Sequence, residues 1–408
     1  MQVDQLKEKS MDAVYLKNEV KNLSDQLKHK VIEYRRHLHR YPELSFEEYN
    51  SSAFVKSRLD EMGITWCSMA TTGVVAFIKG EKSSEEVIAL RADMDALPIT
   101  EENKVAYVSK VSGVMHACGH DAHTASLLGT ASILHSLRSK FGGSVKLIFQ
   151  PGEEKLPGGA SLMIKEGVLQ NPVPSAVIGQ HVMPTLETGK VGVCMGKYMA
   201  SKDDLYVTVF GKGGHGAQPH ENIDPVVIAA HIIIALQQVV SRMATPTNAS
   251  VLSFGKLNAN GSTNVIPDQV HMEGTFRTLH EGWRSEALYK IKKMAEGIAE
   301  SMGGKCVVDI IPGYPFLINE KKLTGQVAEF AGEYLGEENV VDLGIWMASE
   351  DFAYYSQLVD SCFYMLGTGN REQGIDASLH TSTFNIDENA LAISSGLMSY
   401  IALKRLGN

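Results

Sequence analysis

The sequence predicts an α/β protein in which a smaller domain with ferredoxin-like topology is inserted into a larger domain. Two patterns support this fold class. Short apolar strands alternate with helical stretches along most of the chain, and this order changes between about residues 192 and 311. At 408 residues the chain is also longer than one hydrophobic core usually organises, so two domains are expected.

The predicted strands of the larger domain are short apolar or β-branched runs, typical of strands buried within an α/β sheet. Helices are predicted between them over residues 46–62 and 122–138, with Asp121 as the N-cap of the second helix. The predicted strands span residues 74–80, 87–93, 145–150, 176–181 and 362–367.

The inserted segment, residues 192–311, predicts the βαββαβ order of a ferredoxin-like unit. The larger domain then comprises residues 1–191 and 312–408, on either side of the insertion. The six predicted elements are strand 204–211, helix 224–243, strands 249–257 and 269–277, helix 283–302 and strand 305–311.

Composition argues against several classes of partner and location. With 38 basic and 47 acidic residues the formal charge is -9, which offers no electrostatic footprint for nucleic acid or anionic membranes. The most apolar stretch, residues 226–240, is interrupted by His231, Gln237 and Gln238 and is too short for a membrane span. The first 20 residues predict a solvated helix rather than a targeting peptide. Five scattered cysteines do not resemble a secreted disulfide framework, which indicates the cytoplasm.

The segment MHACGHDAHTA, residues 115–125, concentrates histidine around a single cysteine. Gly119 permits a sharp backbone turn that lets Cys118 and His120 converge on one ion. A thiolate together with an imidazole suits zinc or another borderline first-row metal. From this motif alone, a cysteine that only packs in the core is an equally good interpretation.

Further acidic and histidine side chains follow other predicted strands, where sites gather in α/β sheets. The adjacent Glu153 and Glu154 point in different directions, so one can bind a metal while the other holds a water. Each residue alone is better explained by packing or surface charge, but together they favour a functional site. They are Asp93, Asp95, Glu153, Glu154, His181 and His380.

Seven segments match, in order, the motifs of a known family: HRYPELSFEE, LRADMDALPI, MHACGHDAHTA, FQPGEE, GKGGHGAQPH, NVIPDQV and SEDFAYY. They resemble the aminoacylase and carboxypeptidase superfamily of dinuclear metallo-amidohydrolases. Within it, they resemble the branch of auxin-conjugate hydrolases, hippurate hydrolases and N-acetyldiaminopimelate deacetylases. The resemblance begins near residue 30 and implies a mixed-sheet catalytic domain with an inserted lid and dimerisation domain.

The resemblance implies two divalent metal ions per chain, which are zinc, manganese, cobalt or nickel. Other branches have a metal-binding His two residues before the catalytic Asp, and an Asp that bridges both metals. Here Arg91 and Cys118 stand in those two places, and His120 supplies the missing His. Cys118 is therefore expected to be the bridging ligand. The five implied ligands are Cys118, His120, Glu154, His181 and His380.

The resemblance also implies catalytic roles in the larger domain. Glu153 matches the general base, and Asp93 matches the catalytic Asp that orients a metal-bound His, with Asp95 as the weaker candidate. His116 and His123 have no assigned role and are expected to pack or to support the ligands.

In the inserted domain, His215 matches a histidine that stabilises the oxyanion in the neighbouring subunit of a dimer. Asn264 and Arg277 are candidate substrate-binding residues. Arg277 is suited to a bidentate contact with a free carboxylate, or is simply a solvated charge at a strand end.

These assignments predict a cytoplasmic homodimer that uses metal to hydrolyse N-acyl amino acids to a carboxylate and a free amino acid. A dipeptidase or aminoacylase of different acyl preference is the enzymatic alternative. A non-catalytic metal- or ligand-binding descendant is disfavoured because Glu153 is present. A redox-sensing role for Cys118 is weaker still, because no other cysteine lies nearby in sequence.

Overall fold

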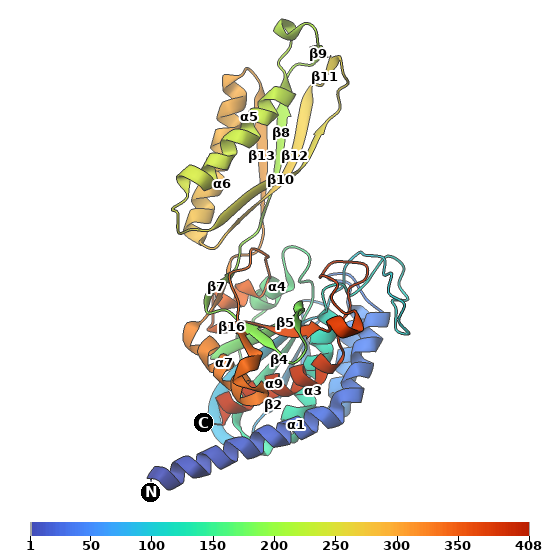
Figure 1. The fold of residues 1–408 in the computed structure, drawn as a ribbon, viewed down its shortest axis with the longest axis vertical. Helices are drawn as coiled ribbons and strands as arrows, with labels where there is room; N and C mark the ends of the chain where they lie inside the picture. The colour runs from blue at the N-terminus through green and yellow to red at the C-terminus, as the bar shows by residue number, and fades with distance from the viewer. Residues whose placement is uncertain (1, 408) are drawn as a thin grey trace. The chain divides into compact units, whose positions relative to one another are not determined.

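The computed structural model describes residues 2–407, with side chains described from residue 14 onward. The chain forms two compact units (Figure 1). Unit 2 contains the predicted ferredoxin-like elements and, in addition, residues 345–353, which the sequence division placed in the larger domain. Unit 1 comprises Met1–Gly196, Ile318–Gly344 and Tyr354–Asn408, and unit 2 comprises Lys197–Leu317 and Ile345–Ala353.

Unit 1 is built on a mixed eight-stranded sheet of order β1-β2-β4-β3-β5-β16-β6-β15. The central strands β4, β3, β5 and β16 are parallel to their neighbours in that group. Antiparallel pairs β1–β2, β2–β4 and β16–β6 flank them, which confirms the predicted mixed α/β class. The strands are β1 (Trp66–Met69), β2 (Gly73–Lys79), β3 (Lys82–Asp93), β4 (Gly142–Gln150), β5 (Ala176–Glu187), β6 (Val191–Val193), β15 (Val340–Asp342) and β16 (Ser361–Gly369).

Helices α3 and α9 lie side by side and contact strands β3 and β4, and α1 packs on both helices. Since protein covers them on several sides, α3 and α9 bury most of their residues and lack a strong polar face. The helices of unit 1 are α1 (Gln2–Arg40), α2 (Tyr49–Met62), α3 (His120–Ser136), α4 (Gly159–Lys165), α7 (Lys321–Leu335) and α9 (Asn389–Leu406).

Three local predictions need correction. The N-terminal helix is not simply solvated, because α1 continues to Arg40 and buries Val20 completely. Asp121 is not the N-cap of α3, since the helix begins at His120, two residues before the predicted start, and Gly119 occupies the cap position. Strand β5 continues to Glu187, so His181 lies within its strand rather than at the end.

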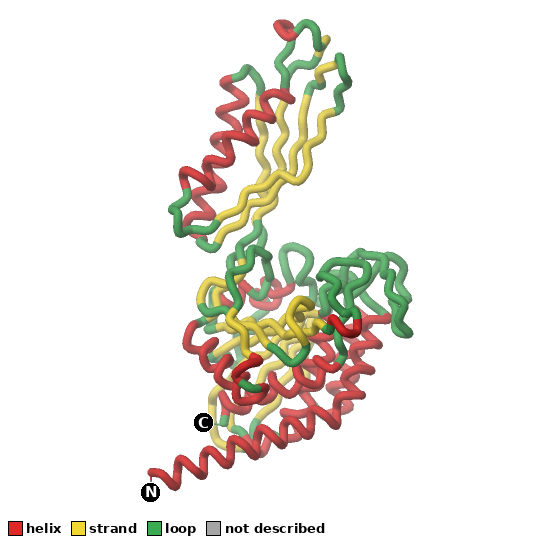
Figure 2. The backbone as a smooth tube through the Cα atoms, in the orientation of Figure 1, coloured by secondary structure: helices red, strands yellow, loops and turns green. Residues whose placement is uncertain are grey.

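Unit 2 has the ferredoxin-like order of elements, with a four-stranded antiparallel sheet of order β10-β12-β8-β13. Figure 2 shows its two long helices together beside the sheet. Its core includes Val207, Ile232, Phe276 and Ile291. The elements are β8 (Asp203–Phe210), β9 (Gly214–His215), α5 (Pro225–Gln238), a π-helical turn (Val239–Met243), β10 (Ser250–Ala259), β11 (Val265–Ile266), β12 (Gln269–Thr278), α6 (Glu281–Ser301) and β13 (Lys305–Pro312).

One stretch, Pro225–Met243, has the length and apolarity of a membrane-crossing helix, judged within the described part of the chain. Its residues Ile228, Ile232 and Leu236 are buried in the core of unit 2. Short elements at the unit boundaries are β7 (Gly196–Met199), β14 (Leu317–Asn319) and α8 (Ala353–Ser356).

Candidate active site

The candidate site of unit 1 lies where the parallel strands β3 and β4 end and helix α3 begins. Asp93 is the last residue of β3, and the pair Glu153 and Glu154 follows β4. His120 is the first residue of α3. Because neighbouring parallel strands end at the same sheet edge, residues distant in sequence meet here.

Gly119 makes the turn that joins Cys118 to helix α3. Its φ of +84° lies in the left-handed region, and a Cβ there would lie 2.4 Å from Cγ2 of Val182. Only glycine fits this position without displacement of the Val182 side chain. The tight turn allows the side chains of Cys118 and His120 to join the same cluster of potential metal ligands.

The thiol of Cys118 lies between two histidines. Its Sγ is 3.3 Å from Nε2 of His181 and 3.3 Å from Nε2 of His380. His380 Nε2 is in turn 3.1 Å from Oε1 of Glu154. Cys118 belongs to two groups of side chains that could each hold a metal ion. His120 and His181 complete one group, and Glu154 and His380 complete the other. Within each group the ligand atoms lie within 4.8 Å of one another. The structure thus brings all five predicted ligands together.

The loop residue His380 adopts an unusual backbone conformation to reach this cluster. Its φ is +60°, a region that non-glycine residues seldom occupy. The backbone N–H of His380 donates to the carbonyl of Ala117, at 2.8 Å, which ties the loop to the segment that carries Cys118. Such conformations persist where the surrounding structure determines them, often at functional sites.

The chemistry of the donor set fits a divalent first-row metal. His120 is fully buried, and its Nε2 has no hydrogen-bond partner among the described residues. Nδ1 of His181 donates to the carbonyl of Val182 at 2.8 Å, which leaves Nε2 with a lone pair facing Cys118. Buried polar atoms normally have partners, so an unpartnered imidazole nitrogen beside a thiol and carboxylates indicates a cation site.

The structure pairs His120 with a different aspartate from the one expected. Nδ1 of His120 lies 3.1 Å from Oδ1 of Asp95, whereas Asp93 is 3.7 Å from Nε2. Asp95 also accepts hydrogen bonds from the Ser45 hydroxyl, at 2.6 Å, and from the Glu154 backbone N–H, at 3.0 Å. Asp95 therefore has the geometry of the orienting carboxylate. The sequence analysis did not predict that Ser45 contacts the site. The signal available was its place in the segment HRYPELSFEE, which matches the family.

Asp93 is instead held by two other buried side chains. Nη1 of Arg91 donates to its Oδ2 at 2.7 Å, and Nδ1 of His123 donates to its Oδ1 at 2.6 Å. Nε2 of His123 accepts the backbone N–H of Val182 at 2.9 Å, so both ring nitrogens are engaged. His123 thus supports the strand that carries His181 rather than offering a donor to a metal.

Burial and neighbouring charges shift the ionisation of the cluster. Burial, followed by Glu154 and Glu153, raises the pKa of the Cys118 thiol well above its usual range. Burial alone would lower the pKa of His120, but the charge of Asp93 and the hydrogen bond to Asp95 outweigh it and raise the pKa to about 10. Burial lowers the pKa of His181 well below its usual value. Without metal, Cys118 and His120 therefore hold protons at neutral pH, and His181 does not.

His116 is also buried, and burial lowers its pKa to about 4. Neither of its ring nitrogens has a hydrogen-bond partner in the described part of the chain. Among the residues that the structure describes, His116 belongs to no donor group that contains Cys118.

The three remaining candidates belong to unit 2. His215 pairs with Val265 in the short ribbon of β9 and β11, and the Gly216 N–H donates to the carbonyl of Asn264 at 2.9 Å. His215 and Asn264 are thus neighbours at one tip of the unit. Arg277 lies on β12, where its Nη1 donates to the carbonyl of Met347 at 3.0 Å, and burial lowers its pKa.

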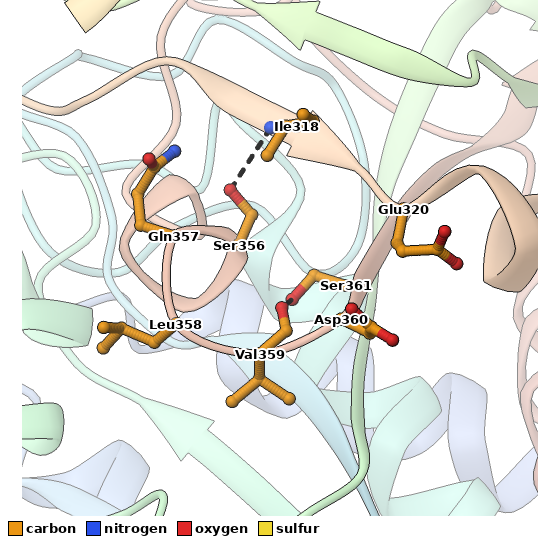
Figure 3. A pocket seen from close by; sticks show the side chains of 8 residues that line it. All are labelled: Ile318, Glu320, Ser356, Gln357, Leu358, Val359, Asp360 and Ser361. Carbon is orange, nitrogen blue, oxygen red and sulfur yellow. Dashed lines mark hydrogen bonds between the residues drawn. The ribbon is translucent and has the colours of Figure 1, made fainter.

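A separate surface pocket of unit 1 lies at the start of β16 (Figure 3). Residues 356–361 line it together with Ile318 and Glu320, and the Ile318 N–H donates to the Ser356 hydroxyl at 3.2 Å. None of the predicted ligands lines this pocket. The donor cluster, rather than this pocket, is therefore the candidate site.

A cluster of histidine, thiol and carboxylate donors, most of them buried, at one edge of an α/β sheet is typical of metal-dependent hydrolases. Residues 89–404 match the model of Peptidase family M20/M25/M40, and the chain belongs to this family. This confirms the family that the seven sequence segments predicted.

Named relatives agree with this membership. The chain is 42% identical over 386 residues to N-acetyl-L-cysteine deacetylase of Bacillus subtilis (strain 168), covering 94% of this chain and 90% of the relative. It is 43% identical over 304 residues to N-acyl-L-amino acid amidohydrolase of Geobacillus stearothermophilus, covering 74% and 81%. The crystal structure of Bacillus subtilis YXEP, described as a dinuclear metal binding peptidase from the M20 family, matches with a TM-score of 0.80 and 36% identity, covering 94% and 99%.

Loading of metal-stripped protein with Zn²⁺ at pH 7 is expected to release about two protons, one each from Cys118 and His120, because ligands bind in their deprotonated forms. Zn²⁺ affinity should rise with pH, by about 100-fold per unit while both groups are protonated, and fall as the pH is lowered. Calorimetric titration in buffers of different ionisation enthalpy measures the number of protons released.

The control is a second buried thiol. Cys118→Ser should release about one proton fewer and bind Zn²⁺ more weakly. Cys306→Ser, on β13 of unit 2, should behave as the unsubstituted protein. Equal proton release from the Cys118→Ser variant and the unsubstituted protein would contradict the assignment of Cys118 as a ligand.

Proposed function

We propose that this chain is a metal-dependent amidohydrolase that cleaves N-acyl amino acids to a carboxylate and a free amino acid. The observation that carries this proposal is the Cys118 thiol shared by two donor groups, with Glu153 in a third group beside His120 and Glu154. The relatives named as a deacetylase and an amidohydrolase of N-acyl amino acids support the same reaction class.

Two divalent ions fit the two groups that share Cys118. His120 and His181 would hold one ion, Glu154 and His380 the other, and Cys118 both. Bound metal of this kind supplies Lewis acidity and lowers the pKa of water. Asp95 would orient the imidazole of His120 through the hydrogen bond at Nδ1, and the chain from Arg91 through Asp93 to His123 would hold the backbone beside His181.

Glu153 is the proposed general base. It is buried in the loop after β4, and its carboxylate would accept a proton from the attacking water as the new C–O bond forms. The same carboxyl group then returns this proton to the amide nitrogen as the C–N bond breaks, so that a neutral amine leaves. No second acid is needed, because the proton that Glu153 takes from water is the one that the leaving nitrogen receives.

His215 is the proposed oxyanion donor. The backbone N–H of Ala217 donates to its Nδ1 at 3.1 Å, so the neutral ring carries its proton on Nε2. The exposed ring can therefore present an N–H donor to a developing oxyanion, without a change of tautomer. We assign it to the site of a partner subunit, in a homodimer formed through the inserted domain, residues 192–311.

Arg277 and Asn264 are the proposed substrate-binding residues. Arg277 uses one guanidinium N–H in its contact with Met347, so further N–H groups remain for the free carboxylate of an N-acyl amino acid. We place the enzyme in the cytoplasm, and the five free thiols support a reducing environment.

Metal-stripped protein reloaded separately with Zn²⁺, Mn²⁺, Co²⁺ or Ni²⁺ is expected to hydrolyse members of a panel of N-acetyl, N-benzoyl and longer N-acyl amino acids. Release of the free amino acid, measured chromatographically, tests the proposed function directly. Dipeptides in the same panel test the alternative specificity. A loaded protein that binds these compounds but turns over none of them would instead be a non-catalytic binding protein.

Glu153→Gln should lower kcat by roughly 10²- to 10⁴-fold with metal content unchanged, because an amide cannot take up and return a proton. Glu154→Gln should lower metal occupancy, because a neutral amide is a poorer donor to a cation. The two residues are adjacent and identical, so each variant controls for the other. Mass spectrometry of bound metal and kinetics at saturating substrate measure the two effects, and the opposite pattern would reverse the roles.

Mixing of inactive His215→Ala chains with inactive Glu153→Gln chains should restore part of the activity, because a mixed dimer then contains one intact site. Hydrolysis is measured after subunit exchange, with each variant alone treated in the same way. His220→Ala, an exposed histidine five residues away, should stay active and serves as the matched control. Proven exchange without recovered activity would remove His215 from a role across the dimer.

A further inference from the structure

The short loop that carries Glu153 is held by buried carboxylates on both sides. The backbone N–H of Gly152 donates to Oε1 of Glu48 at 2.7 Å. The backbone N–H of Glu154 donates to Oδ2 of Asp95 at 3.0 Å. The backbone N–H groups of the two residues on either side of Glu153 are therefore anchored to carboxylates from other parts of unit 1.

Glu48 is fully buried, and its partners come from three separate segments. Oε1 accepts the N–H of Gly152 and also that of Phe46, at 2.9 Å, while Oε2 accepts the hydroxyl of Thr72 at 2.7 Å. A buried carboxylate costs free energy unless such donors meet it. This arrangement makes Glu48 a fixed point between the loop after β4 and the turn before β2.

A tight contact reinforces this anchor. Gly152 has a φ of +57°, and a Cβ there would lie 2.2 Å from Cε1 of the Phe46 ring. Phe46 itself has a φ of +69°, a backbone conformation that bulky residues seldom adopt. The surrounding structure thus forces the ring against the backbone at Gly152, next to Glu153.

We propose that Glu48 is a positioning residue for Glu153, which it holds in place through its hydrogen bond to the Gly152 backbone. The inference rests on the proposed function, in which Glu153 is the general base. A base has to lie within hydrogen-bond reach of the proton it takes, and a misplacement of about 1 Å can cost roughly 100-fold in rate. Glu48 itself takes no proton in the reaction.

The pattern of contacts identifies a conservative variant. In Glu48→Gln, the amide oxygen can accept both backbone N–H groups that now meet Oε1. The new NH₂ group can donate to Thr72, whose hydroxyl rotates to become the acceptor. Glu48→Gln therefore keeps the anchor without the charge, whereas Glu48→Ala removes it and Glu48→Asp withdraws the carboxylate by one methylene.

Glu43 provides a matched control in the same segment. Its carboxylate also accepts backbone N–H groups, from Asn50 at 3.0 Å and from Ser51 at 2.8 Å. Those groups belong to the first turn of α2 rather than to the loop of Glu153. Glu43→Ala should therefore lower the melting temperature, as Glu48→Ala does, but leave kcat and KM unchanged.

The experiment measures kcat, KM and metal content of the metal-loaded protein, together with amide hydrogen exchange over residues 150–158. Glu48→Ala should lower kcat by roughly 10- to 100-fold with KM and metal content little changed. Exchange at Gly152 should become faster. Glu48→Gln should keep kcat and the exchange rate at Gly152 near those of the unsubstituted protein. Glu48→Asp, which retains a carboxylate but withdraws it, should change both in the same direction as Glu48→Ala.

Unchanged kcat in Glu48→Ala, or a loss of kcat as large in Glu48→Gln as in Glu48→Ala, would overturn the positioning role. An equal loss of kcat in Glu43→Ala would show a general effect of stability and would also overturn it. An unsubstituted protein inactive on the whole panel would instead refute the proposed function. Hydrogen exchange then still tests whether Glu48 anchors the loop.

Discussion

The burial of charged side chains at one edge of the unit 1 sheet constrains the rest of that unit. Asp93 and Asp95 have almost no exposed surface, and neither is stable there without donors. Arg91 and His123 supply the donors for Asp93, while His120, Ser45 and the Glu154 backbone supply those for Asp95. Strands, helix and loops therefore have to meet at this edge in one arrangement, and the candidate metal ligands are part of it.

A second buried network, of hydrogen bonds and ion pairs, joins the start of helix α3 to helix α1. Asp121, next to His120, accepts a hydrogen bond from Nε of Arg35 at 2.8 Å and lies 2.7 Å from Nδ1 of His39. Burial would raise the pKa of Asp121, but Arg35 and His39 outweigh it and hold the pKa far below its usual range. Removal of one partner from such a network leaves an uncompensated buried charge. Helix α1, which carries Arg35 and His39, is thereby coupled to the position of His120.

Rigid backbone and directed polar contacts act together at the candidate site. Gly119 and Gly152 each take a positive φ where a Cβ would collide with a neighbouring side chain. Each lies directly before a segment that carries a candidate functional residue, His120 in one case and Glu153 in the other. Because the backbone packs directly against a side chain at each glycine, these two segments have little room to move. A catalytic site needs its groups placed to within a fraction of an ångström, and this packing helps to meet that requirement.

The sequence by itself determined the α/β class, the ferredoxin-like order of unit 2 and the family, because these depend on local periodicity and on motifs that can be read in order. The resemblance of its motifs to that family also implied the set of five metal ligands that the structure brings together, which are Cys118, His120, Glu154, His181 and His380. Only the tertiary structure decided that Asp95, rather than Asp93, pairs with His120. It also decided that Asp121 binds Arg35 instead of capping α3, and that Glu48 holds Gly152. These choices join residues between 25 and 104 positions apart in the chain. Chemically identical carboxylates can accept hydrogen bonds from the same donors. Which carboxylate does so depends on its distance from the donor in the folded chain, and the sequence does not contain that distance.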